Sequence, residues 1–210
     1  MRQSIGEIVR EYGPFPQAKN IGGVTYDGRV VWYADGDSMR AFDPETGVER
    51  GAIDVPAQAG TAFDGEFLYQ LAKGQIQKID PKTKGVVATI PAPTDGDNSG
   101  LAWAEGMLWV GEYKARKIHQ VDSQTGAILR TIESNRFVTG VTWVDGELWH
   151  ATWEDDESDL RRINPDTGEV LERVELPAGV KISGLESDGN DRFYCGGGNS
   201  GMVRAVRRPR

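Results

Sequence analysis

The sequence predicts an all-β protein, a five-bladed β-propeller of four-stranded antiparallel blades. Three observations predict it. Short runs of alternating aromatic or β-branched residues end at clusters of Gly, Asn or Asp. A four-strand pattern recurs at the spacing of propeller blades. The segment that the fifth unit lacks at the C-terminus is found near the N-terminus.

The pattern is clearest between Ser99 and Ser134. Four expected strands follow one another there, and turns of Gly, Asp and Ser separate them. Their sequences are "GLAWA", "MLWVGE", "KIHQV" and "AILRTI". One such unit predicts a four-stranded antiparallel meander.

Other copies repeat each part of this unit. The first strand recurs as "GVTYDG", "GTAFDG", "GLAWAEG", "GVTWVDG" and "GLESDG", with starts 37, 40, 40 and 44 residues apart. The second strand carries one aromatic residue per copy, and most third strands end in a "DPETG"-like turn. We therefore expect blades that start near residues 22, 59, 99, 139 and 183.

The fifth copy ends without a fourth strand. "GEIVREYGPFP" from Gly6 matches "GEVLERVELPAG" from Gly168, which supplies a fourth strand in its own unit. We therefore expect residues 6–12 to complete the last blade and close the ring, which leaves no open edge. The whole chain, residues 1–210, is then a single domain.

The composition limits the partners. The net charge of -8 and the pI of about 4.9 argue against a nucleic-acid or anionic membrane partner. The basic end "RAVRRPR" is expected to be a solvated chain end beside an acidic body. With one cysteine, no signal-like segment and no long apolar run, we expect a cytoplasmic, soluble monomer.

Alternation along the first strands assigns small residues to the central channel. Each copy begins with Gly, and the next channel position is Thr or Ala in four copies but Glu186 in the fifth. A carboxylate in a narrow channel needs a cation, a basic partner, water or a proton. Glu186 is therefore a candidate catalytic residue, and a metal ion beside it is one alternative.

Loops at the channel mouth supply the remaining candidates. Aligning the copies brings the ends of their second strands together around that mouth, and the segments that enter the first strands join them there. The candidate catalytic residues are Glu186, Glu112 and His150. The candidate ligand-binding residues are Tyr33, Asp35, Gln70, Trp153, Asn98, Arg136 and Lys181.

Motifs for other chemistry are missing. "WEDDESD" is acidic but lacks the spacing of an EF-hand loop, so we predict no metal ligands among its residues. No G-x-S-x-G, HExxH, P-loop or dinucleotide motif occurs.

Three segments resemble the glutamine cyclotransferase (glutaminyl cyclase) family of five-bladed propellers. They are "GEFLYQLAKGQIQKIDPKT", "GVTWVDGELWHATWEDDESDLRRINPDTGEV" and "SGLESDGNDRFYCGGG". The resemblance implies cyclisation of an N-terminal glutamine with the help of a Glu, an Asn and a Lys. Gln70 and Trp153 match the family, but Tyr33 and Ala151 stand where Glu and Asn are expected, and the Lys position falls in "GGGNSG".

We therefore expect a propeller that binds a small molecule or a peptide end at the channel mouth. The first alternative is an active enzyme. It would be an acyltransferase of the glutaminyl-peptide cyclotransferase type, or a metal-assisted lyase or hydrolase that is similar to streptogramin lyase. The second alternative is a protein-interaction platform.

Overall fold

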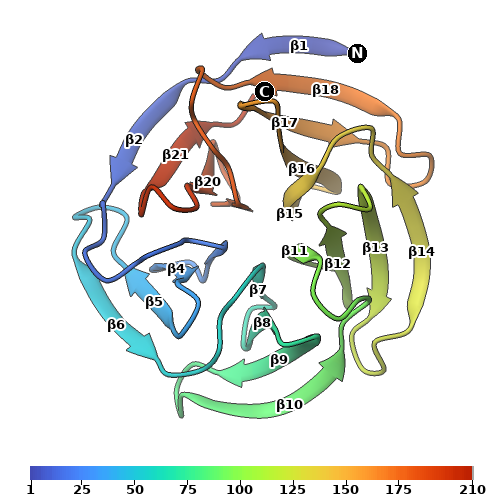
Figure 1. Ribbon diagram of the computed structural model, residues 1–210. Coiled ribbons are helices and arrows are strands. Elements are labelled where there is room, and N and C mark those ends of the chain that lie inside the picture. Colours follow the sequence, from blue (N-terminus) through green and yellow to red (C-terminus); the bar gives the residue numbers. More distant parts are fainter. Residues whose placement is uncertain (210) are drawn as a thin grey trace.

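The computed structural model describes residues 1–209, and within that range it contains strands and no helix. The strands form five sheets around a common axis, and Figure 1 shows one sheet after another around the ring. Four antiparallel strands make each blade, as the sequence predicts.

Each blade runs outward from the axis in chain order. Blade 1 contains β3 (Gly23–Tyr26), β4 (Val31–Ala34), β5 (Met39–Phe42) and β6 (Glu49–Ile53). Blade 2 contains β7 (Thr61–Phe63), β8 (Leu68–Ala72), β9 (Gln75–Asp80) and β10 (Gly85–Pro91). Blade 3 contains β11 (Asn98–Ala104), β12 (Met107–Glu112), β13 (Lys117–Asp122) and β14 (Ile128–Glu133).

The last two blades include the N-terminal strands. Blade 4 contains β15 (Val138–Val144), β16 (Glu147–Glu154), β17 (Glu157–Ile163) and β18 (Val170–Glu175). Blade 5 contains β19 (Gly184–Ser187), β20 (Arg192–Gly196) and β21 (Val203–Arg207), with β2 (Ile8–Tyr12) as its outer strand. A short strand, β1 (Arg2–Ile5), lies outside blade 4.

The predicted closure by the N-terminal strand is confirmed. Strand β2 pairs antiparallel with β21, so that Tyr12 lies opposite Val203. Tyr12 is 3% exposed, and its hydroxyl donates a hydrogen bond of 2.9 Å to the carbonyl of Pro44 in blade 1. Strand β2 therefore completes blade 5 and also ties it to the next blade.

Strand β1 was not expected from the sequence. It pairs parallel with β18 and gives blade 4 a fifth strand. The chain then crosses to blade 5 at Gly6, where an added Cβ would lie 2.7 Å from Leu176 Cδ2. A residue with a side chain would therefore force the crossing away from blade 4.

The first glycine of every inner strand lies against the next blade. A Cβ added at Gly60 would be 2.4 Å from Leu101 N, and one at Gly100 would be 2.5 Å from Val141 N. The equivalent distances at Gly23, Gly140 and Gly184 are 2.4, 2.7 and 2.8 Å. These distances support the steric explanation for the glycines, because no Cβ fits between adjacent inner strands.

Aromatic residues fill the space between blades farther from the axis. The aromatic residue of a second strand packs on that of the next blade's first strand. Tyr69 stacks on Trp103 with ring centroids 5.2 Å apart, and Trp109 stacks on Trp143 at 6.4 Å. Such pairs contribute beyond the apolar area they bury, so the blade interfaces form the core.

We predict that Tyr12→Ala lowers the free energy of unfolding by about 3 kcal/mol, because it removes a buried ring and a hydrogen bond from the closing strand. Urea unfolding measures this loss. Ile5→Ala, at a residue 83% exposed, is the control and should change stability by less than about 0.5 kcal/mol. Equal stability of Tyr12→Ala and the parent would contradict the closing role of β2.

Candidate functional site

A depression of about 370 Å³ lies where the segments entering all five inner strands converge. This is the mouth of the ring, and we call it the mouth depression. Loops that follow β12 and residues of β16 add an aromatic wall. Its lining consists of Asn20, Gly22, Gln58, Ala59, Gly96, Asp97, Asn98, Ser99, Tyr113, Thr139, Trp153, Lys181, Ile182 and Ser183.

Trp153 and Lys181 form one side of the mouth depression. The Lys181 ammonium lies 5.5 Å from the centroid of the Trp153 ring, within the range of a cation–π interaction. The segment around Lys181 is held there because the Ile182 N–H donates a 3.2 Å hydrogen bond to Ser158 Oγ, and Ser158 pairs with Trp153 in the sheet. Within residues 1–209, no carboxylate forms an ion pair with Lys181.

Tyr113 lies across the mouth on the turn after β12. Asp97 fixes this turn: its Oδ2 accepts a 2.7 Å hydrogen bond from the Lys114 N–H, and its carbonyl accepts one of 2.8 Å from the Tyr113 N–H. The Tyr113 ring also packs on Phe137, with centroids 4.9 Å apart. Asp97 thus has a structural role that holds an aromatic residue at the rim.

Two side chains in the mouth depression carry buried polar atoms without a hydrogen-bond partner. They are Thr139 Oγ1 and Asn98 Oδ1. Thr139 is 6% exposed and occupies the irregular step in the β15–β16 pairing between Val138 and Gly140. Bulges commonly redirect side chains next to binding sites. Buried polar atoms normally have partners, so these two mark positions where a ligand or water would bond.

Glu186 lies inside the ring on β19 and bridges two other blades. Its Oε2 accepts a 2.7 Å hydrogen bond from Thr25 Oγ1 in blade 1, and its Oε1 accepts one of 2.6 Å from Thr142 Oγ1 in blade 4. Burial raises the pKa of Glu186 to about 7, although these two hydroxyls and the Ser187 N–H act in the opposite direction. Glu186 as a whole residue is half-buried.

The other two candidate catalytic residues have separate partners. Glu112 Oε2 lies 3.1 Å from His119 Nε2, and His119 Nδ1 lies 2.9 Å from Thr131 Oγ1. His150 is buried between blades, and its Nδ1 has no partner. Burial lowers the pKa of His150 to about 4, and the positive charge of Arg161 adds to this effect. No hydrogen bond or ion pair joins Glu186, Glu112 and His150.

The structure places three of the seven candidate ligand-binding residues in the mouth depression: Asn98, Trp153 and Lys181. The other four are engaged elsewhere. The Tyr33 hydroxyl donates a hydrogen bond of 2.8 Å to Glu49, and Asp35 forms an ion pair of 2.6 Å with Arg40. Gln70 forms hydrogen bonds with Thr61 and with backbone carbonyls. Arg136 donates a hydrogen bond of 2.7 Å to the carbonyl of Glu154.

Sequence reasoning missed Tyr113 and Thr139 as mouth residues. Both belong to loops expected at the mouth, "GEYKARK" and "SNRFVTG". Other residues of the same loops gave a stronger polar signal, and the position of Thr139 depends on the irregular pairing of β15.

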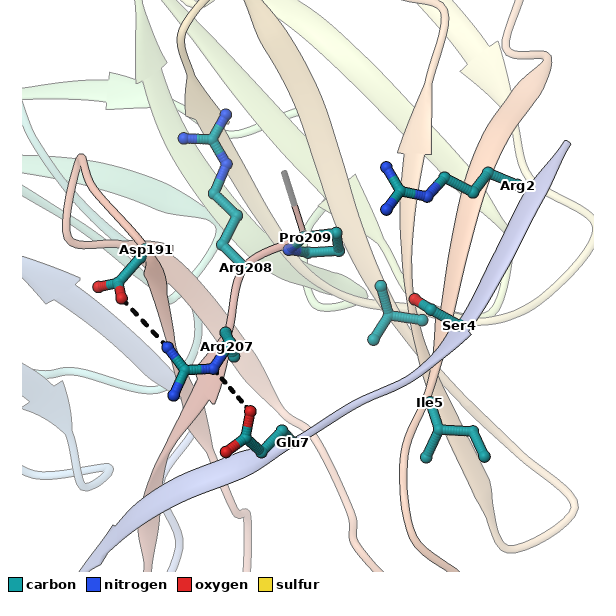
Figure 2. Close-up of a pocket in the computed structure, with 9 residues that line it drawn as sticks. Arg2, Ser4, Ile5, Glu7, Asp191, Arg207, Arg208 and Pro209 are labelled. Carbon is teal, nitrogen blue, oxygen red and sulfur yellow. Dashed lines mark hydrogen bonds and ion pairs between the residues drawn. The ribbon is translucent and has the colours of Figure 1, made fainter.

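Another cleft, of about 570 Å³, lies away from the mouth between β1 and the end of β21. Figure 2 shows Arg207 between Glu7 and Asp191, at 2.6 and 3.3 Å. Arg208 pairs with Asp145 at 2.6 Å and with Glu147 at 3.0 Å. The two arginines are therefore paired, and the Arg208 pairs join blade 5 to blade 4, which indicates a structural role.

These ion pairs correct the expectation for the basic C-terminal end. Arg208 is 9% exposed, so it is part of the blade 4–5 seam and not a solvated chain end. The reason is that β21 carries the chain past the acidic turn of blade 4, where Asp145 and Glu147 lie.

The described residues contain no helix of the length and hydrophobicity needed to cross a membrane. Among the same residues, no group of three or more His, Cys, Asp or Glu side chains is placed to hold a metal ion.

The fold and its closure define the chain as a five-bladed β-propeller. Among solved structures it is similar to glutaminyl cyclase from Myxococcus xanthus, with a TM-score of 0.79 and 18% identity over 98% of this chain and 97% of that one. Virginiamycin B lyase from Staphylococcus aureus has a TM-score of 0.55 and 15% identity over 97% of this chain and 73% of that one.

The WD40 propeller domain of Doa1 is also similar, with a TM-score of 0.58 and 17% identity over 90% of this chain and 64% of that one. The sequence matches no family model and no curated protein. The chain therefore has the propeller fold of glutaminyl cyclase, and at this identity the likeness concerns the fold.

We predict that Glu186 makes stability depend on pH. The folded state keeps a proton on Glu186 up to about pH 7, whereas the unfolded state releases it near 4.5. Stability should therefore fall as pH rises between these values, by up to about 3 kcal/mol. The substitution Glu186→Gln removes this contribution to the pH dependence of stability.

Urea unfolding of both proteins from pH 5 to pH 8 measures the difference. The Glu186→Gln protein should gain stability relative to the parent as pH rises. Parallel curves for the two proteins across this range would show that Glu186 is ionised throughout.

Proposed function

We propose that this propeller binds a small molecule or the end of a peptide in the mouth depression. The observation that carries the proposal is the combination of the Trp153–Lys181 wall with the unpartnered hydroxyl of Thr139. An aromatic face, a cation and a polar atom without a partner converge on one hollow. Such mixtures of apolar wall and few polar groups are typical of small-molecule sites.

The size of the mouth depression supports the same function. Its volume of about 370 Å³ lies within the range of roughly 300–1,000 Å³ of small-ligand sites. Five inner strands hold its floor, and glycine contacts between adjacent strands leave little freedom there. A rigid floor with side chains from several blades favours a preformed site.

A second candidate is cyclotransferase activity on peptides with an N-terminal glutamine. Glu186 favours it, since a pKa of about 7 suits a group that gives and takes protons at neutral pH. The similarity to glutaminyl cyclase adds support from the fold. Glu186 is not among the residues that line the mouth depression, so we rank binding first.

We predict that Trp153→Ala weakens ligand binding at least about tenfold, because it removes the aromatic wall and the support of Lys181. Calorimetric titration with Ala-Ala-Ala-Phe and with N-acetyl-phenylalanine measures the affinity. Lys82→Gln, at an exposed lysine in the β9–β10 turn, is the control and should bind like the parent. Failure of both probes to bind the parent would contradict the proposal.

Incubation with Gln-Ala-Ala-Phe tests the second candidate. If the parent protein releases ammonia above background and the Glu186→Gln protein does not, the function is catalysis and not binding alone. Binding of this peptide without ammonia release would leave the first proposal as it stands.

A further inference from the structure

Building on the proposed function, we propose that the ligand is an extended peptide whose C-terminal carboxylate binds Lys181, with its chain lying across the mouth toward Lys73. Two neighbouring depressions and the Lys181 ammonium, which forms no ion pair within the described residues, point to this ligand. The inference names the ligand class and its direction, which the proposed function leaves open.

Lys181 is placed to receive an anion. Its stem lies close to Gly198, where an added Cβ would be 3.5 Å from Lys181 Cδ, and its ammonium lies over Trp153. Both contacts fix the position of the charge. Within the described part of the chain the Lys181 ammonium has no carboxylate partner, so a carboxylate supplied by a ligand would form an ion pair with it.

Thr139 supplies a second group for the same carboxylate. Its hydroxyl is buried in the wall of the mouth depression and has no partner. A hydroxyl can donate one hydrogen bond to a carboxylate oxygen. A carboxylate bound to the Lys181 ammonium would lie in the depression whose wall contains this hydroxyl.

A second depression of about 270 Å³ extends the mouth depression. The two share Gln58, Ala59, Gly96 and Asn98, and the second continues to Lys73 and Asp95. The two depressions therefore adjoin, with Lys181 in the lining of the first and Lys73 in that of the second, and we take them as one groove. A single amino acid would leave most of this groove empty, whereas an extended peptide would follow it.

Amide side chains lie where the two depressions join. Asn98 Oδ1 has no partner. Gln58 Oε1 accepts a 2.9 Å hydrogen bond from the Lys73 N–H, and the Gln58 amide nitrogen makes no hydrogen bond within the described part of the chain. Amide groups can both donate to and accept from a peptide backbone. This chemistry suits a peptide chain better than an apolar ligand.

The opposite direction, with an N-terminal amine in the mouth, would depend on Asp97. The Asp97 carboxylate already accepts hydrogen bonds from the N–H groups of Lys114 and Ala115, at 2.7 and 3.4 Å. Its charge is therefore partly satisfied by the turn it supports. Lys181 lines the mouth depression and forms no ion pair within the described residues, so the carboxylate end is expected in the mouth.

Calorimetric titration with Ala-Ala-Ala-Phe in four forms tests the direction. The C-terminus is a free carboxylate or an amide, and the N-terminus is free or acetylated. We expect the free carboxylate to bind at least about tenfold tighter than the amide, whether or not the N-terminus is acetylated. Lys181→Gln should abolish this preference, and the control Lys82→Gln should keep it.

The outcomes separate this inference from the proposed function. Equal affinities for the carboxylate and amide forms would overturn the inference but not the proposed binding at the mouth. An affinity that depends on the N-terminus and not on the C-terminus would have the same meaning. If N-acetyl-phenylalanine binds as tightly as the tetrapeptide, the ligand is not an extended peptide, and a small carboxylic acid is indicated instead. No binding of any probe overturns both proposals.

Discussion

The close approach of the five inner strands is the constraint on which the rest of the structure depends. Each strand reaches its neighbour through a glycine, and any Cβ there would come within 3 Å of the adjacent blade. This approach fixes the spacing of the blades, and the spacing in turn lets aromatic residues stack between them. The mouth depression is the place where the same five segments begin, so its shape follows from the glycine contacts.

Buried polar groups of the ring find partners within a blade and across blades. Asp159 is buried but accepts hydrogen bonds from Arg161 and Arg173 of its own blade, each at 2.7 Å, and Glu186 accepts hydrogen bonds from hydroxyls of blades 1 and 4. Asn98 and Thr139 also carry unpartnered atoms, and both residues line the mouth depression. A surface that leaves such atoms unpaired is better explained by a ligand than by stability, since unpaired buried groups cost free energy.

Much of the fold could be predicted from the sequence, because its signals are local and repeated. Turn residues, aromatic alternation and the match between the Gly6 and Gly168 segments predict the blades and their closure, and the structure confirms both. Strand β1 could not be predicted, since four residues carry no repeat signal. The site was harder still: Tyr113, Thr139 and Lys181 come from different blades, and they meet only after the ring has closed.

The closure of blade 5 pairs two strands that are far apart in the sequence and are therefore synthesised at different times. The hydrogen bond between Glu11 and Arg204 links residues 193 positions apart. On the ribosome, strand β2 is made before blade 1, yet its partner β21 is made after blade 4. Blades 1 to 4 can form as they emerge, while the ring stays open until β21 has been made. Contacts of such long sequence separation slow folding, so ring closure is expected to be the late step.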